Sequence, residues 1–274
     1  MRASIATTAS LRKPSTLQGP DLHFSVPPAR VVVLNRLRRA IDYLESPELR
    51  RARARGIRVD FVAELLDLRQ RFGIAPGTVV DVGANRGDFI RAVRFVDPRA
   101  HVVAFEPIPA LHERLQAEFE AQGCEIFPYA LDAEAGPREF FLTQADDLSS
   151  LLPPTVELTR SLREGAEATK SVAIRVEARR LDDVLDLSKR PGPVLLKLDV
   201  QGSELRALRG ATRQLEHVAC VKLEHHFDRF YEGQSELADL VALMQDRGFP
   251  RMLQINAKVS DARLRWCDFV FFRS

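Results

Sequence analysis

The 274-residue chain is long enough for one large α/β domain with an N-terminal extension. Its 40 Lys and Arg residues nearly balance 38 Asp and Glu residues, so the net charge of +2 argues against a nucleic-acid-binding protein. The sequence has no apolar run of about 18 residues, which argues against a transmembrane segment. Its three cysteines are far apart and lie in or beside apolar strand runs, which predicts buried free thiols and a cytoplasmic protein.

The N-terminal part is predicted to form a tail and a helical extension. Residues 1–28 are predicted to be disordered. Their first 20 residues carry three basic side chains and no acid, a composition also found in organelle transit peptides. Residues 29–76 are predicted to be helical, because two sets of apolar residues recur at helical spacing. These are Leu34, Leu37, Ile41 and Leu44, and then Phe61, Leu65, Leu68 and Phe72.

A basic run lies between these two sets of apolar residues, with five arginines from Arg50 to Arg58. Such a run is typical of a solvated helix face. An acidic substrate or a membrane surface is the alternative partner for it.

Residues 77–274 are predicted to form a single α/β domain. Strands are predicted at 78–83, 101–106 and 125–130, with helices at 88–96 and 109–122 between them. This alternation predicts parallel strands joined by right-handed crossovers.

Residues 137–177 break the alternation. Two strand-like runs, REFFLT and SVAIRVEARRL, flank a long polar loop, which predicts an antiparallel insertion. The elements predicted beyond it are strand 193–200, helix 202–215, strand 217–224, loop 225–234, helix 235–247 and two strands near 251–256 and 267–273. Two successive strands imply a hairpin, so one of them must run antiparallel to the rest of the sheet.

The stretch 78–90, TVVDVGANRGDFI, has the pattern of a strand that turns into a helix at a ligand-binding loop. Gly83 and Gly87 allow a sharp turn and a close approach of the backbone to a ligand. The spacing differs from the dinucleotide pattern G-x-G-x-x-G, because Asp81 comes before the glycines. An early carboxylate suits a ligand with a cationic or hydroxyl-bearing end, such as the amino-acid end of S-adenosylmethionine. The residues expected to contact that cofactor are Asp81, Gly83, Asn85 and Gly87.

The ends of the next two strands extend this predicted site. Glu106 ends the second strand where an α/β unit returns to the crevice, so it is expected to accept both ribose hydroxyls. Ala130 and Leu131, at the end of the third strand, are expected to edge the adenine. The neighbouring Asp132 lies in the stretch DAEAG and is interpreted as a turn residue.

Charged residues also end the fourth predicted strand. Lys197 and Asp199 lie on one face of that strand by alternation. A charged pair in an apolar strand is costly unless it is paired or lies at the crevice. We therefore predict that Asp199 orients the acceptor hydroxyl or holds the amino group of the cofactor. A structural contact between Lys197 and Asp199 is the alternative.

The fifth predicted strand ends in a second group of candidate catalytic residues. Glu224 is a second carboxylate, and His225 or His226 is a candidate base for removing the hydroxyl proton. Adjacent residues point to opposite sides of an extended chain, so one histidine is expected to serve. No metal is predicted, because Asp199 and Glu224 lack a recognisable third ligand.

Four blocks of the sequence together resemble one known family. VVDVGANRGDF, VVAFEPIP, KLDVQGSELRALRGA and the closing YEGQ followed by GF resemble the FkbM family of S-adenosylmethionine-dependent methyltransferases, from about Val59 to the C-terminus. The resemblance implies a Rossmann-like class I methyltransferase fold: a mostly parallel seven-stranded sheet with an antiparallel C-terminal strand and helices on both faces. It also implies O-methylation of a hydroxyl on a small molecule, sugar or natural product.

Individual positions match or depart from the family pattern. Ser149, Ser150 and Leu151 match a Ser-Leu in the family's insertion, which implies a wall or lid of the substrate pocket; a surface Ser pair that caps a short helix is the alternative. Glu224 matches an acid common in the family, whereas Gln201 stands where relatives usually have Glu. N-methylation and an inactive domain that binds a partner are therefore the alternative functions. The oligomeric state is not predicted.

Overall fold

A computed structural model describes residues 46–161, 170–260 and 263–273. The predicted tail and the predicted helix around residues 34–44 lie outside these ranges, so the domain boundaries stay predictions. Within the described part of the chain, no helix is both long enough and apolar enough to cross a membrane.

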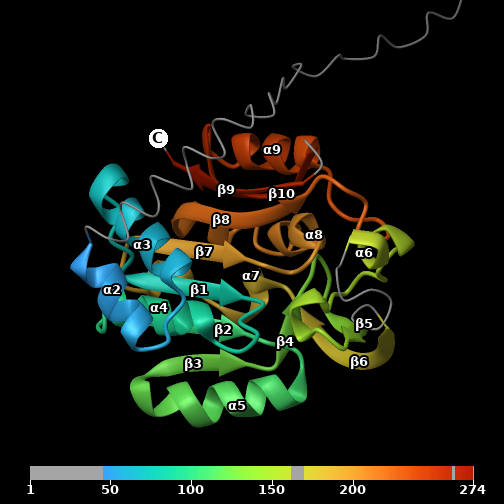
Figure 1. Cartoon of the computed structure of the whole chain (residues 1–274), viewed down its shortest axis with the longest axis horizontal. Helices are drawn as coiled ribbons and strands as arrows, with labels where there is room; N and C mark the ends of the chain where they lie inside the picture. The colour runs from blue at the N-terminus through green and yellow to red at the C-terminus, as the bar shows by residue number, and fades with distance from the viewer. Residues whose placement is uncertain (1–45, 162–169, 261–262, 274) are drawn as a thin grey trace, which may run out of the picture.

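A seven-stranded sheet forms the centre of the molecule, in the order β3-β2-β1-β7-β8-β10-β9 (Figure 1). The strands are β1 (Thr78–Val82), β2 (His101–Phe105), β3 (Cys124–Phe127), β7 (Val194–Leu198), β8 (Val218–His226), β9 (Arg251–Ser260) and β10 (Arg263–Phe272). Strand β1 runs parallel to β2 and β7, whereas β10 runs antiparallel to β8 and β9. The predicted mostly parallel sheet with an antiparallel C-terminal strand is confirmed.

Helices cover both faces of this sheet, because apolar side chains alternate along the central strands. Val79 and Leu195 face one layer, which holds α2 (Pro47–Ala54), α3 (Val59–Phe72), α4 (Asp88–Val96) and α5 (Pro109–Phe119). Val80 and Leu196 face the other layer, which holds α7 (Leu181–Val184), α8 (Glu204–Arg209), the 3₁₀ turn η5 (Gln214–His217) and α9 (Leu237–Asp246). The three cysteines are free and buried, as predicted.

The predicted strand 125–130 is wrong, because the chain forms two strands on either side of Pro128. Strand β3 belongs to the main sheet, and β4 (Tyr129–Leu131) belongs to a second sheet in the order β4-β6-β5. Proline lacks the N–H that a continuous ladder needs. Strands β5 (Gly136–Thr143) and β6 (Ser171–Arg179) pair antiparallel, which confirms the predicted pairing of these two runs. Between them lie the 3₁₀ turn η2 (Asp146–Leu148) and α6 (Val156–Ser161).

Two further boundaries differ from the predicted ones. Helix α8 ends at Arg209 instead of 215, and Gly210 is its C-cap. Only glycine fits at 210, since a Cβ there would lie 2.0 Å from the Asp132 carbonyl oxygen. His225 and His226 were expected in a loop, but they are the last residues of β8, where β10 pairs with them. The two histidines are therefore held by the sheet.

Candidate active site

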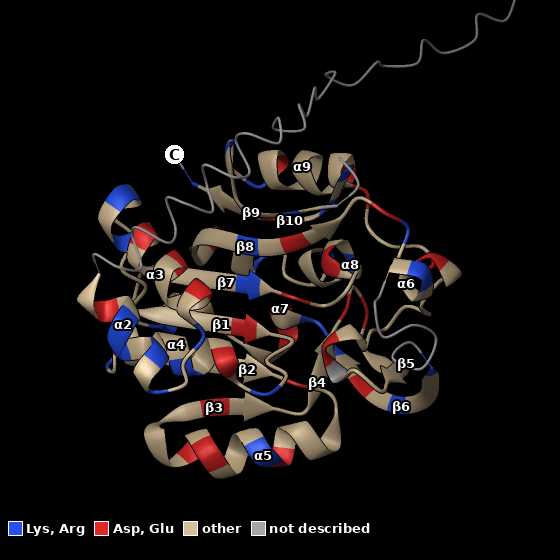
Figure 2. Cartoon of the chain, viewed as in Figure 1, with Lys and Arg blue, Asp and Glu red and all other residues tan. Residues whose placement is uncertain are grey.

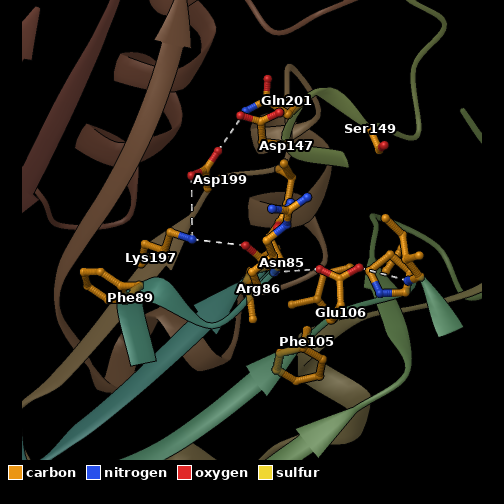
Figure 3. Close-up of a pocket in the computed structure, with 18 of the residues that line it drawn as sticks. Asn85, Arg86, Phe89, Phe105, Glu106, Asp147, Ser149, Lys197, Asp199 and Gln201 are labelled. Atoms are coloured by element: carbon orange, nitrogen blue, oxygen red, sulfur yellow. Dashed lines mark hydrogen bonds and ion pairs between the residues drawn. The ribbon is translucent and has the colours of Figure 1, made fainter. Parts of the chain in front are cut away.

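A cavity of about 380 Å³ opens where β1, β2 and β7 end (Figure 3). This is the edge at which open α/β sheets bind ligands. Residues from the main strand ends, from α3 and from the insertion line the cavity. Among them are Arg58, Phe61, Gly83, Asn85, Arg86, Phe89, Glu106, Ile108, Ala130, Leu131, Phe140, Ser149, Leu151, Lys197, Asp199 and Gln201.

The turn after β1 has a backbone that requires glycine. Gly83 has a φ of +74°, and a Cβ on it would lie 2.1 Å from the Asp199 carbonyl oxygen. Asn85 follows with a φ of +48° and lines the cavity. Gly87, with a φ of +83°, caps α4 and packs against Phe119, so its small size serves helix packing. Of the two glycines, Gly83 is the one at the cavity wall.

Glu106 is held by backbone N–H groups on both of its carboxylate oxygens. Oε2 accepts a hydrogen bond from Asn85 N at 2.8 Å, and Oε1 accepts one from Ile108 N at 2.9 Å. Burial raises the pKa of Glu106 to about 7, although these two hydrogen bonds favour the charged form. Each oxygen retains lone-pair capacity for a further donor. Ala130 and Leu131 lie on the apolar side of the cavity, as Ile108 does.

Asp81 lies behind Lys197. The Asp81 side chain is 0% exposed, and its Oδ1 accepts a hydrogen bond from Lys197 Nζ at 2.8 Å. Lys197 also donates to the Gly83 carbonyl oxygen at 3.1 Å, whereas the Asp199 carboxylate is 3.7 Å away. Burial raises the pKa of Asp81. Burial also opposes charge on Lys197, but the Asp81 and Asp199 carboxylates together outweigh it and raise the pKa of Lys197. Asp81 therefore does not line the cavity itself, but it holds the Lys197 ammonium, which does.

Gln201 joins the two candidate catalytic carboxylates. Its amide nitrogen donates to Asp199 Oδ1 at 2.9 Å and to Glu224 Oε2 at 3.2 Å. Its amide oxygen accepts a hydrogen bond from the Tyr231 hydroxyl at 2.9 Å. Burial acts to raise the pKa of Asp199, but the Lys197 and Lys222 ammonium groups and the Gln201 hydrogen bond together outweigh it and hold that pKa below its usual range. The structure thus brings Asp199 and Glu224 to one place, with Asp199 at the cavity wall.

The two histidines point to opposite sides of β8, as their adjacency predicts. His226 Nε2 lies 3.0 Å from Glu224 Oε2. Burial acts to lower the pKa of His226, but the hydrogen bond to Glu224 and the charges of the surrounding carboxylates together outweigh it and raise that pKa. His225 packs edge-on against Phe227 on the other side, and burial lowers its pKa to about 4. His226 is therefore the histidine that contacts one of the two candidate catalytic carboxylates, Glu224.

Residues of the insertion form part of the cavity wall. Ser149 lines the cavity, and its Oγ accepts a hydrogen bond from Thr143 N at 3.0 Å. Ser150 donates to the Gln201 carbonyl oxygen at 2.8 Å. Both serines are buried, so the alternative of a surface Ser pair is wrong, and Ser149 and Leu151 form part of the cavity wall. Asp132, interpreted from the sequence as a turn residue, is bound by Arg138 and Arg206 at 2.8 and 2.6 Å and is absent from the cavity lining.

Sequence reasoning missed three contributors to the site. Nothing local in the sequence indicates that the Tyr231 hydroxyl orients Gln201, 30 positions away. Arg58 and Phe61 were read as part of a basic run and an apolar helix face, yet both line the cavity. The signal that could have found them is their position at the start of α3, the helix immediately before β1.

Comparisons with known proteins point to one family. Residues 81–250 match the model of the methyltransferase FkbM domain. The 2-O-methyltransferase NoeI of Sinorhizobium fredii is 26% identical over 198 residues, which cover 68% of this chain and 80% of that protein. The 31-O-demethyl-FK506 methyltransferase FkbM of Streptomyces tacrolimicus is 29% identical over 202 residues, 66% of this chain and 76% of that protein.

A search of solved structures finds the N-terminal domain of EvdMO1, crystallised in the presence of SAH and D-fucose. It aligns with a TM-score of 0.44 at 12% identity, over 78% of this chain and 83% of that one.

Proposed function

Because the chain belongs to the FkbM methyltransferase domain family, we propose that it transfers the methyl group of S-adenosylmethionine to an oxygen atom of a small hydroxylated molecule, such as a sugar or natural product. The observation that carries this proposal is the Glu106 carboxylate, held by two backbone N–H groups at the cavity wall. Two relatives have oxygen methylation in their names, which supports an oxygen acceptor.

The cavity residues fit S-adenosylmethionine from one end to the other. Ile108, Ala130 and Leu131 offer an apolar surface for the adenine. Glu106 offers two acceptor oxygens for the two ribose hydroxyls. The Gly83 backbone lies at the cavity wall, where the donor can meet it, and the Asp199 carboxylate suits the donor's amino group. When bound, the cofactor supplies a methyl group on a positively charged sulfur.

The residues beyond Asp199 would handle the acceptor and its proton. Asp199 lines the cavity and is held ionised by Lys197, so it can orient an acceptor hydroxyl by accepting its hydrogen bond. The proton released from that hydroxyl needs a base, and in this proposal Glu224 receives it with His226 beside it. Gln201 keeps the two carboxylates at a fixed separation. His225 has no part in this proposal, since it lies on the opposite side of β8.

Calorimetric titration with S-adenosylhomocysteine tests the donor site. The wild-type protein should bind it, and Glu106→Ala should weaken binding about 100-fold, because charge-assisted hydrogen bonds to two hydroxyls are lost. Glu134→Ala removes an exposed carboxylate outside the cavity and is the matched control. Labelled S-adenosylmethionine with a panel of sugars and hydroxylated natural products then tests the acceptor class. A folded wild-type protein that binds no S-adenosylhomocysteine would overturn the proposal.

A further inference from the structure

The start of helix α3 forms one wall of the cavity, although it lies outside the segment that matches the family. The match covers residues 81–250, whereas Arg58 and Phe61 precede β1. Both residues line the cavity together with Phe89 and Lys197. The Phe61 and Phe89 rings meet edge to face at 5.3 Å, which closes the contact between α3 and α4. The family match therefore leaves this wall without an assigned role.

The order of the strands decides which end of a donor would reach this wall. Glu106 follows β2, and the apolar residues Ala130 and Leu131 lie beside it, so ribose and adenine occupy that side. Asp199 follows β7, on the other side of β1. Lys197 Nζ lies 5.6 Å from the centre of the Phe89 ring, which places α4 and the α3 start near the β7 end. The amino-acid end of the donor would therefore meet α3.

An amino-acid end carries a carboxylate as well as an amino group, and the carboxylate needs a cation. The Lys197 ammonium is already engaged by Asp81 and the Gly83 carbonyl oxygen. Arg58 stands over the Phe61 ring at 4.7 Å, with its side chain 53% exposed. Its Nε and Nη2 donate to Asp60, and Nη1 carries two further N–H donors. A planar guanidinium with donors to spare is suited to a carboxylate.

A buried ionic cluster fixes α3 against the sheet, one turn after Phe61. Lys222 Nζ, on β8, lies 3.0 Å from Asp268 and 3.5 Å from Glu64 of α3. Asn256 donates to both of these carboxylates. Figure 2 shows charged segments on the otherwise uncharged central strands β1, β7 and β8. A binding group on an element held in this way is better positioned than one on a free loop.

We propose that Arg58 binds the carboxylate of the amino-acid end of S-adenosylmethionine, so that α3 completes the donor site from outside the family-matched segment. This proposal rests on the proposed function, because it takes the donor to be S-adenosylmethionine. It assigns to Arg58 a specificity for the amino-acid end, as distinct from the nucleoside.

Two ligands separate this role from a structural one. S-adenosylhomocysteine carries the amino-acid end, and 5′-methylthioadenosine keeps the adenine, ribose and sulfur but lacks it. By calorimetry, Arg58→Ala should weaken the binding of S-adenosylhomocysteine about tenfold and leave the binding of 5′-methylthioadenosine unchanged. Arg58→Lys should recover part of the loss, because it restores the charge without the planar fork.

Arg71→Ala is the matched control on the same helix. Arg71 pairs with Asp67 and stands over the Phe72 ring at 5.6 Å, much as Arg58 pairs with Asp60 and stands over Phe61, but it does not line the cavity. The Arg71→Ala variant should leave the affinities for both ligands unchanged. If Arg58→Ala weakened the binding of both ligands equally, or of neither, the proposal would be overturned while the donor assignment stayed intact. A wild-type protein that binds neither ligand would remove the donor itself, and with it this role of Arg58.

Discussion

The two halves of the cavity are built in different ways. At the ends of β1 and β2, backbone N–H groups hold one carboxylate, Glu106, next to a turn that needs Gly83. At the ends of β7 and β8, side chains hold one another: Gln201 spans Asp199 and Glu224, and Tyr231 orients Gln201. A backbone-held site keeps its geometry when neighbouring side chains change, whereas a side-chain network changes with each member.

This difference matches the two tasks proposed for the halves. The donor is the same molecule in every S-adenosylmethionine-dependent enzyme, so a fixed backbone frame suits it. The acceptor differs from enzyme to enzyme, and a network of side chains can be altered one residue at a time. Gln201, where the family resemblance leads one to expect Glu, lies in the side-chain half.

The largest expected effect comes from the ion pair that joins the two halves. Lys197→Met would leave the Asp81 carboxylate buried at 0% exposure without its cation. Removing one partner of a buried pair typically costs about 3–5 kcal/mol, so the free energy of unfolding in urea should fall by about that amount. Replacing both residues, with Lys197→Met and Asp81→Leu, should recover most of the loss, because no buried charge remains. A single variant that loses less than about 1 kcal/mol would show that the halves do not depend on this pair.

The next effect concerns the backbone-held half and its dependence on pH. Burial raises the pKa of Glu106 to about 7, with Asp81 opposing its ionisation and Lys197 favouring it. The ionised carboxylate accepts both ribose hydroxyls, whereas the protonated form loses one acceptor, so affinity should rise with pH. S-adenosylhomocysteine should bind about tenfold more tightly at about pH 8 than at about pH 6, as measured by calorimetry.

Two variants identify the titrating group in that experiment. Glu106→Gln should remove the pH dependence along with part of the affinity. Burial also raises the pKa of Glu204 to about 7, but Glu204 bonds to Gly202 N and does not line the cavity. Glu204→Gln should therefore keep the pH dependence of the wild type. If Glu204→Gln abolished it and Glu106→Gln did not, Glu106 would not be the group that meets the ligand.

The same contrast explains how much could be predicted from the sequence. The strands β1 and β2, Gly83 and Glu106 were found because their signals are local: apolar runs, a glycine at the turn, and an acid at a strand end. The pairing of Lys197 with Asp81, 116 positions earlier, was not predicted, and a contact with the neighbouring Asp199 was considered only as an alternative. A strand pattern shows which residues share a face, but the pairing of two strands decides which side chains meet.

The side-chain half was predicted only as a set of candidates. Alternation along β8 indicated that only one of the two histidines would be a candidate base. In the structure His226 contacts Glu224, because the even-numbered residues Lys222, Glu224 and His226 share one face of that strand. The strand was expected to end at 224, and its extension through His226 depends on pairing with β10, more than 35 residues later. The proposed role of Arg58 was not predicted, because a basic residue at the start of a helix is most often only solvated.

The smallest expected effect tests whether the side-chain half depends on a single hydroxyl. Tyr231→Phe leaves the Gln201 amide oxygen without the donor at 2.9 Å, so the amide can turn and bring its oxygen toward Asp199 and Glu224. Urea unfolding should show a loss of about 1 kcal/mol, typical of one hydrogen bond. S-adenosylhomocysteine affinity should be unchanged, since Tyr231 lies outside the proposed donor site. Tyr129→Phe is the control in the other half: Tyr129 lines the cavity, and its hydroxyl makes no hydrogen bond within the described residues. Equal losses in the two variants would mean that the Tyr231 hydroxyl does not orient Gln201.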